Sequence, residues 1–435
     1  MNYSDTLDFL FSSLPMYQRI GKAAYKSDLT ATLSLDRHLG EPHRSFQTIH
    51  IAGTNGKGSV SHMLAAIMQG AGYKTGLYTS PHYTDFRERI RINGEMIDEQ
   101  YVVDFVEANK DVLLELKASF FEMTVAIAFT YFKYERVDIA IVETGMGGRL
   151  DSTNIITPLI SVITNIGYDH TQYLGDTLEK IAIEKAGIIK KEVPVVIGSA
   201  KDEVREVFAA KAREMDSAIY FADENFTARH LDTAGDASVQ TFNLYRDGIL
   251  FMKELLTDLP GDFQLLNIPA VLQTLELLGK HFKVNPGVIR SGLRDVKGLT
   301  GFKGRWQVMR QAPLVICDSG HNADGMKISV SQLKGIDKER LHIVLGMVND
   351  KDADSILSLL PRNADYYFTK ADIPRALDQE LLRGKALEYS LKGNSYPFVI
   401  EAFNAALACA DKEDLIFIGG SSFVVADFLR DYNNV

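Results

Sequence analysis

Short apolar runs alternate with helical patterns along this chain of 435 residues, and few folds accommodate that order. In the first part of the sequence the runs occupy residues 48–52, 74–79, 137–144, 159–166 and 194–199. Strands that alternate with helices form βαβ units, which assemble a mostly parallel sheet covered by helices on both faces. The pattern therefore predicts an α/β fold.

Two departures from this alternation divide the chain. Residues 218–257 contain shorter, alternating segments typical of a small antiparallel patch attached to the main sheet, and residues 297–305 are rich in glycine. Beyond them, a second series of apolar runs occupies residues 314–317, 341–345, 366–369 and 415–418. We therefore predict a nucleotide-binding domain over residues 1–296, a linker over 297–305 and a Rossmann-like α/β domain over 306–435.

A glycine-rich turn joins the first apolar run to a helical pattern at residues 59–70. It comprises Gly53, Thr54, Asn55, Gly56, Lys57, Gly58 and Ser59. Backbone N–H groups and a lysine at a helix N-terminus bind phosphate oxygens, so this turn predicts a P-loop for a nucleotide. The general pattern also has a glycine at position 51 and a hydroxyl at position 58, which this chain lacks. The alternative is a turn whose glycines serve tight geometry alone.

Polar side chains also follow three other predicted strands: Ser80 after residues 74–79, Glu143 near the end of 137–144, and His170 after 159–166. Ligands of α/β sheets lie beyond the carboxyl ends of the strands. A carboxylate buried there needs a neutralising partner, and Mg²⁺ shared with nucleotide phosphates supplies one. Histidine is an unusual Mg²⁺ ligand, so a structural role for His170 remains the alternative.

Two further residues allow more than one interpretation. Lys185 lies near the C-terminal end of a predicted helix at residues 177–187, where the helix macrodipole favours a cation. Asp318 ends an apolar run, where it either caps the following helix or takes part in catalysis.

Charge and hydropathy exclude several classes of protein. The net charge of −10 argues against nucleic acid as a partner, because phosphate-backbone binding needs a basic face. Arg87, Arg89 and Arg91 precede an Asn-Gly turn and indicate a hairpin with a charged outer face; contact with an anionic substrate is the alternative. The sequence lacks both a long apolar run and a basic N-terminal start, so we expect a cytoplasmic protein without a membrane span. Cys317 and Cys409 are expected to be buried free thiols.

Several ordered blocks resemble one family, the folylpolyglutamate synthases and dihydrofolate synthases of the Mur-type amide ligases. The blocks are the P-loop, the Thr-Ser-Pro-His segment at 79–82, the segment at 120–124, and the Glu-Thr-Gly-Met-Gly-Gly-Arg-Leu-Asp segment at 143–151. Residues 26–29 lie where bifunctional relatives bind dihydropteroate. The resemblance extends over almost the whole chain and implies a monomer.

The resemblance also implies residue roles. Ser80, Glu143 and His170 match Mg²⁺ ligands, and Lys185 matches a lysine carried as a carbamate, which suits a second metal. Matches to nucleotide contacts are Asn267, Arg305 and Asp318. Matches to catalytic residues are Lys57, Lys185, Asp318 and His321. Matches to substrate contacts are Phe121, Glu122, Thr124, Arg149, Leu150, Asp151, Ser152 and Ser421.

The implied reaction is ATP-dependent joining of L-glutamate to the carboxylate of dihydropteroate, of folates or of both. A carboxylate reacts with an amine only after its oxygen becomes a leaving group, and phosphoryl transfer from ATP to give an acyl phosphate achieves this. The alternatives are a Mur-type ligase for a peptidoglycan precursor and a switch driven by ATP hydrolysis. Only about 46 residues precede the P-loop strand, whereas a Mur-type ligase of that kind has an additional N-terminal domain.

Overall fold

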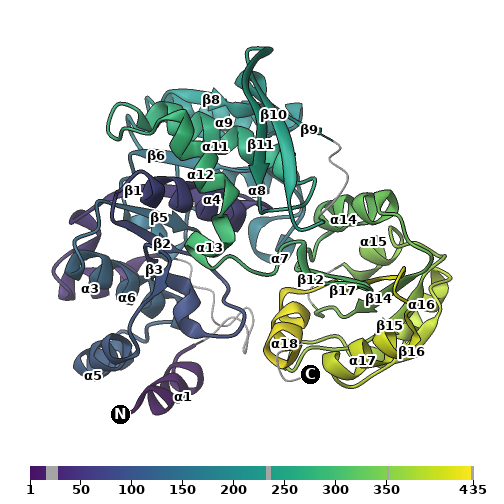
Figure 1. Ribbon diagram of the computed structural model, residues 1–435. Helices are drawn as coiled ribbons and strands as arrows, with labels where there is room; N and C mark the ends of the chain where they lie inside the picture. The colour runs from purple at the N-terminus through teal and green to yellow at the C-terminus, as the bar shows by residue number, and fades with distance from the viewer. Residues whose placement is uncertain (16–27, 232–236, 350–351, 433–435) are drawn as a thin grey trace.

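The computed structural model describes residues 1–15, 28–231, 237–349 and 352–432. Two α/β parts lie next to each other, with the C-terminal part in green and yellow (Figure 1). The predicted α/β fold is therefore confirmed. Within the described ranges, every helix is too short or too polar to cross a bilayer. Lys26 and Ser27 of the predicted dihydropteroate segment lie outside these ranges.

The first part is built on a sheet with the strand order β4-β3-β2-β5-β1-β6-β7-β8. Strands β2, β5, β1, β6, β7 and β8 are parallel to one another, whereas β3 and β4 form an antiparallel hairpin that pairs with β2 at one edge. The bounds are β1 (Gln47–Ala52), β2 (Thr75–Tyr78), β3 (Ile90–Ile92), β4 (Glu95–Met96), β5 (Ile139–Glu143), β6 (Ile160–Ile163), β7 (Val195–Ile197) and β8 (Ile219–Phe221).

Helices cover both faces of this sheet because its central strands are apolar on both sides. In β5, Ile139 and Ile141 pack on the face of α4 and α11, whereas Ala140 and Val142 pack on the face of α5 and α6. The first face carries α4 (Lys57–Gly70), α11 (Gln264–Leu278), α12 (Pro286–Arg294) and α13 (Val296–Thr300). The second face carries α1 (Tyr3–Ser13), α3 (Thr30–His38), α5 (Glu99–Glu115) and α6 (Phe120–Tyr134).

The region 218–257 differs in detail from its prediction. Its first segment, β8, extends the main parallel sheet, and the remainder forms a separate three-stranded antiparallel sheet in the order β11-β10-β9. Those strands are β9 (Phe226–Leu231), β10 (Gln240–Arg246) and β11 (Ile249–Thr257). The helices α7 (Thr171–Leu174), α8 (Leu178–Ala186), α9 (Asp202–Glu214) and α10 (Ala222–Asn225) lie between β6 and β9 in the chain.

The C-terminal part has a second sheet in the order β12-β13-β17-β14-β15-β16, parallel except for β12. Its strands are β12 (Gln307–Gln311), β13 (Leu314–Asp318), β14 (Leu341–Leu345), β15 (Asp365–Phe368), β16 (Gly393–Ser395) and β17 (Leu415–Gly419). Its helices are α14 (Ala323–Gly335), α15 (Ala353–Leu357), α16 (Gln379–Glu388), α17 (Val399–Cys409) and α18 (Ser422–Tyr432). The four predicted runs are strands of this sheet.

Two details concern the linker and the cysteines. Residues 296–300 form α13, which is anchored on α4 because the His62 ring and the Thr300 hydroxyl are 2.8 Å apart. Cys317 is a buried free thiol, as predicted, whereas the prediction for Cys409 is wrong. Cys409 is the last residue of α17, and its side chain is exposed there.

Candidate active site

The glycine-rich turn connects β1 to the N-terminus of α4. Gly53 and Gly56 have φ angles of +147° and +84°, a region that side chains rarely adopt. Gly56 also precedes the helix without a side-chain cap, so the first N–H groups of α4 keep their capacity to donate hydrogen bonds. A Cβ on Gly56 would lie 2.2 Å from Oδ1 of Asn267, which places that predicted nucleotide contact beside the turn.

Substitution of Gly56 tests this turn. Gly56→Ala combines backbone strain with the collision against Asn267, so we expect a lower melting temperature and an increase of about tenfold or more in the Kd for ATP. Gly72→Ala is the matched control, because Gly72 at the other end of α4 has a φ of +91° and open space around it. Equal effects of the two substitutions on ATP binding would contradict the expectation.

The chain after β6 holds the turn in place. Thr164 donates its hydroxyl to the Asn55 carbonyl at 2.6 Å, and Asn165 accepts the Asn55 N–H at 2.8 Å. The Thr54 hydroxyl donates to the Gly167 carbonyl at 3.1 Å. The segment that follows β6 therefore supports the turn from the end of the neighbouring strand.

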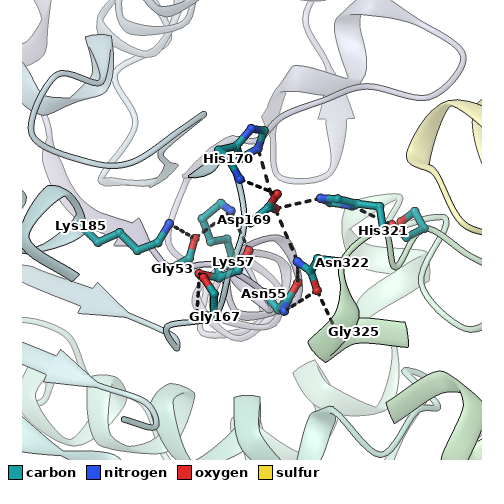
Figure 2. A network of polar contacts seen from close by, with 12 residues as sticks. Gly53, Asn55, Lys57, Gly167, Asp169, His170, Lys185, His321, Asn322 and Gly325 are labelled. Atoms are coloured by element: carbon teal, nitrogen blue, oxygen red, sulfur yellow. Dashed lines mark hydrogen bonds and ion pairs between the residues drawn. The ribbon is translucent and has the colours of Figure 1, made fainter. Parts of the chain in front are cut away.

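Two lysines converge on the carbonyl groups of the turn (Figure 2). Lys57 donates to the carbonyls of Gly53 and Thr54 at 3.1 and 3.3 Å, and Lys185 donates to the Gly53 carbonyl at 2.8 Å. Lys185 is only 3% exposed, so its position near the end of α8 does more than complement a helix dipole. Burial, and secondly the charge of Lys57, lower the pKa of Lys185 to about 7.

Glu143 and Ser80 meet because their strands are neighbours in the sheet. Glu143 is 4% exposed at the end of β5, and its Oε2 accepts the Ser80 N–H at 3.3 Å. Burial raises the pKa of Glu143 to about 7, although Lys57 and the Ser80 N–H lower it. A buried carboxylate with so few donors fits a site for a divalent cation.

His170 lies on the loop after β6, with Nε2 3.8 Å from Oδ2 of Asp169. No group of three or more His, Cys, Asp or Glu side chains suited to a metal occurs among the described residues. The predicted set contains one serine, one glutamate and one histidine, so its role as a metal site stays a prediction.

Residues 144–151 form a loop after the carboxyl end of β5, and hydrogen bonds to Asp151 hold this loop together. Its carboxylate accepts the N–H groups of Gly145 and Met146 at 2.8 and 2.9 Å, and the Thr153 hydroxyl at 2.6 Å. Arg149 forms an ion pair with Glu184 at 2.8 Å. Leu150 is partly buried, and Ser152 is buried in a 3₁₀ turn.

The predicted substrate contacts Phe121, Glu122 and Thr124 lie in the first turns of α6. A Cβ on Gly145 would lie 2.5 Å from the ring of Phe121, so Phe121 packs against residues 144–151. Glu122 accepts the Ser119 N–H at 2.7 Å and the Thr32 hydroxyl at 3.2 Å. The Thr124 hydroxyl donates to the Phe120 carbonyl at 2.7 Å. Both Glu122 and Thr124 therefore have local structural partners, and their role as substrate contacts stays a prediction.

In the C-terminal part, Asp318 does not cap α14, so that interpretation is wrong. Asn322 is the cap, since its side chain accepts the Gly325 N–H at 2.9 Å. Asp318 instead accepts the N–H groups of Trp306 and Gly320, each at 2.8 Å. Nη1 of Arg305 is buried without a hydrogen-bond partner among the described residues. Burial lowers the pKa of Arg305, but interactions with Tyr83, Asp318 and Glu143 outweigh burial and raise it overall.

Side chains of the two parts meet around Asp169, a residue that the sequence analysis missed (Figure 2). Its Oδ2 is 3.1 Å from Nε2 of His321 and 3.5 Å from Nδ2 of Asn322. Nδ1 of His321 faces the Ser319 carbonyl at 3.1 Å, so both ring nitrogens of His321 face oxygen atoms. Adjacency to His170 was the only signal in the sequence for Asp169.

Further contacts join the two parts, whereas the predicted substrate contact Ser421 takes no part in them. Nδ2 of Asn322 donates to Oδ1 of Asn55 at 3.0 Å, and the hydroxyls of Tyr83 and Ser319 are 2.8 Å apart. Ser421 is buried at the start of α18, where its hydroxyl accepts the Phe423 N–H at 3.2 Å. The geometry thus brings the P-loop and the loop after β6 to the C-terminal part.

Comparisons with known proteins match both parts. The Mur ligase middle domain family matches residues 51–275, and the Mur ligase, glutamate ligase domain family matches residues 304–422. Folylpolyglutamate synthase of Lacticaseibacillus casei is 33% identical over 87% of this chain and 88% of its own length. A probable bifunctional folylpolyglutamate synthase/dihydropteroate synthase of Haloferax volcanii is 32% identical over 98% of this chain, which spans only 50% of that longer protein.

Solved structures agree with these relatives. E. coli FolC in complex with DHPP and ADP has a TM-score of 0.85 at 28% identity, covering 100% of this chain and 98% of that one. A bifunctional folylpolyglutamate synthase/dihydrofolate synthase of Yersinia pestis, complexed with AMPPNP and Mn ion, has a TM-score of 0.83 at 26% identity, with coverage of 100% and 98%.

Proposed function

Because this chain belongs to the folylpolyglutamate synthase/dihydrofolate synthase family of Mur ligases, we propose that it uses ATP and a divalent metal to join L-glutamate to a pteroate or folate carboxylate. The contact of Lys57 and Lys185 with one P-loop carbonyl, beside buried Glu143, carries the proposal. The named complexes of relatives with ADP, AMPPNP, Mn ion and DHPP support the choice of ligands.

Different residues of this chain bind the phosphates, the acceptor and glutamate during carboxylate activation. The free N–H groups at the start of α4 and the Lys57 ammonium bind the phosphates and stabilise charge on the transferring γ-phosphoryl group. The substrate carboxylate attacks the γ-phosphorus, the bond to the β-phosphate oxygen breaks, and ADP leaves to give an acyl phosphate. The neutral amine of glutamate then attacks the acyl carbon and releases phosphate and a proton, which forms the amide. On the C-terminal side, His321 and Ser421 contact glutamate, and Asp318 and Arg305 contact the nucleotide. The pterin is bound by residues 120–124 and 149–152.

We propose Ser80, Glu143 and His170 as the residues that hold Mg²⁺, with Lys185 as a carbamate toward a second metal. The support is the meeting of the Ser80 and Glu143 segments and the burial of the Glu143 carboxylate. Bound Mg²⁺ would neutralise charge on the phosphate oxygens.

We also propose that residues 1–296 form the nucleotide-binding domain, residues 297–305 the linker and residues 306–435 the Rossmann-like domain. The contacts of Asn322 with Asn55 and of His321 with Asp169 support a site that closes between the two domains and excludes water from the acyl phosphate. We also retain the expectations of a monomer and of a cytoplasmic location. Size-exclusion chromatography with light scattering and fractionation of the source cell test them.

Purified protein supplied with ATP, Mg²⁺ and L-glutamate, together with dihydropteroate or tetrahydrofolate in separate reactions, tests the reaction. We expect ADP to form only when both glutamate and a pterin acceptor are present, and the pterin product to gain one or more glutamyl residues by mass. ADP release without either substrate would favour an ATP-driven switch, and turnover only with a peptidoglycan precursor would favour the other Mur-type reaction.

Dependence on CO₂ tests the carbamate. Carbamylation forms a bond between Nζ and the CO₂ carbon and releases a proton, so it needs the neutral amine. With a pKa of about 7, Lys185 is about nine-tenths neutral at pH 8. We expect protein depleted of CO₂ at pH 6 to lose most of its activity and to regain it with bicarbonate at pH 8.

Two variants separate Lys185 from other lysines in this test. Lys185→Gln is expected to be inactive with or without bicarbonate, whereas Lys191→Gln, which alters an exposed ion pair with Glu192, should keep the wild-type response. A wild-type rate unaffected by CO₂ depletion would argue against the carbamate.

A further inference from the structure

The structure separates the three arginines of residues 87–91. Arg87 forms ion pairs with Asp85 at 2.7 Å and with Glu99 at 3.1 Å. Arg91 donates to the Gly94 carbonyl at 2.7 Å, on the hairpin turn. Arg89 is 3% exposed, and among the described residues no carboxylate forms an ion pair with it.

The contacts of Arg89 are neutral. Its Nε donates to Nδ1 of His82 at 2.7 Å, and its guanidinium lies 5.3 Å from the centre of the Phe120 ring. Because Nδ1 of His82 accepts, the proton of the neutral ring is on Nε2.

A buried guanidinium without a counter-ion is costly, because arginine stays protonated in proteins and loses its hydration on burial. Burial lowers the pKa of Arg89, and the nearby Tyr78, Glu143 and Glu88 oppose this effect. Glu88 is occupied elsewhere, since it accepts the Tyr83 N–H at 2.6 Å. The guanidinium also interacts with the Tyr78 hydroxyl, which is neutral, and the remaining N–H bonds on the two Nη atoms provide a forked donor for an incoming carboxylate.

Aromatic rings surround this guanidinium on one side. Phe120 stacks on Phe11 with ring centres 5.4 Å apart and meets Phe86 edge-on at 5.9 Å, and Phe86 meets His82 at 6.2 Å. On the other side, His82 is two residues from Ser80, whose N–H bonds Glu143. Because Nδ1 of His82 bonds Arg89 and the charge of Glu143 acts on Arg89, this guanidinium lies near the proposed metal and phosphate site.

We propose that Arg89, oriented by His82, binds the aryl carboxylate of a pteroate-type acceptor and holds it for phosphorylation. This inference rests on the proposed function and specifies the acceptor as an aromatic acid. Arg89 is a substrate-binding residue, and His82 is a positioning residue that fixes the plane of the guanidinium.

A cycle of ligands and variants tests the contact directly. Isothermal titration calorimetry on the full-length protein compares pteroate with pteroate carboxamide, which differ only in the charged group. We expect the wild type to prefer the carboxylate by about tenfold to a hundredfold, as expected for a charged hydrogen-bonded pair. Arg89→Gln should bind both ligands equally, and Arg87→Gln, the matched control on the same segment, should keep the wild-type preference.

Each outcome decides between the alternatives. Equal wild-type affinities for the two ligands, or a preference for pteroate that survives in Arg89→Gln, would overturn the inference. If Arg89 has only a structural role, Arg89→Gln should weaken the binding of pteroate and of pteroate carboxamide by the same factor, which would also overturn it. If Arg89→Gln does not fold, Arg89→Lys replaces it and should keep only part of the preference, because the fork is lost. Glutamate incorporation by the wild type is measured in parallel, so that failure of the reaction is separated from failure of the Arg89 contact.

Discussion

Lys57→Met is expected to lower the kcat of ATP-dependent glutamate incorporation by about a hundredfold to a thousandfold. The Lys57 ammonium lies over the P-loop, 3.1 Å from the Gly53 carbonyl, and it is the cation best placed to stabilise charge that develops on the γ-phosphoryl group. Loss of one preorganised donor from a site that excludes water has effects of this size. The measurement is the rate of ADP release with saturating glutamate and acceptor.

Lys57→Met should also change the pKa values of two neighbouring side chains, Lys185 and Glu143. Lys57 lowers the pKa of both Lys185 and Glu143, so its removal should raise both pKa values and move the bicarbonate response of the enzyme to higher pH. Lys74→Met is the control, because Lys74 pairs with Glu135 at 2.6 Å, away from the turn. A folded Lys57→Met protein with a near-wild-type rate would contradict the proposed reaction.

Much of the site was predictable because parallel strands bring their carboxyl ends to one edge. Strand order β2-β5-β1-β6 places the segment with Ser80 beside Glu143, and Glu143 beside the P-loop. The apolar runs predicted these strands, and a polar residue after each run marked the edge. Periodicity alone thus located groups that are far apart in the chain.

Contacts that depend on tertiary packing left no such signal. Asp169 contacts His321 only because the two α/β parts pack against each other, and no local sequence pattern records that packing. The segment with Arg87, Arg89 and Arg91 illustrates the same limit. The Asn-Gly turn predicted the hairpin. The sequence could not distinguish Arg87, which forms ion pairs with Asp85 and Glu99, from Arg89, which is buried against Phe120 of α6.

Glu143→Gln is expected to abolish glutamate incorporation and, at the same time, to stabilise the free protein. Burial raises the pKa of Glu143 to about 7 from the ordinary value of 4.5. The folded state therefore binds the proton more tightly than the unfolded state, and wild-type stability falls as the pH rises from about 4.5 to 7. By pH 8 the loss is about 3 kcal/mol, which glutamine avoids because it has no charge to bury.

Urea unfolding between pH 4.5 and 8, without nucleotide and with EDTA, measures this effect. The free energy of unfolding of Glu143→Gln should exceed that of the wild type at pH 8, and the difference should shrink towards pH 4.5. Glu115→Gln, at the exposed end of α5, is the control and should show no such trend. A wild type that is the more stable protein at pH 8 would mean that Glu143 already has a partner in the free enzyme. If Glu143→Gln is more stable than the wild type but inactive, then the Glu143 carboxylate lowers the stability of the free protein and is retained because the reaction requires it.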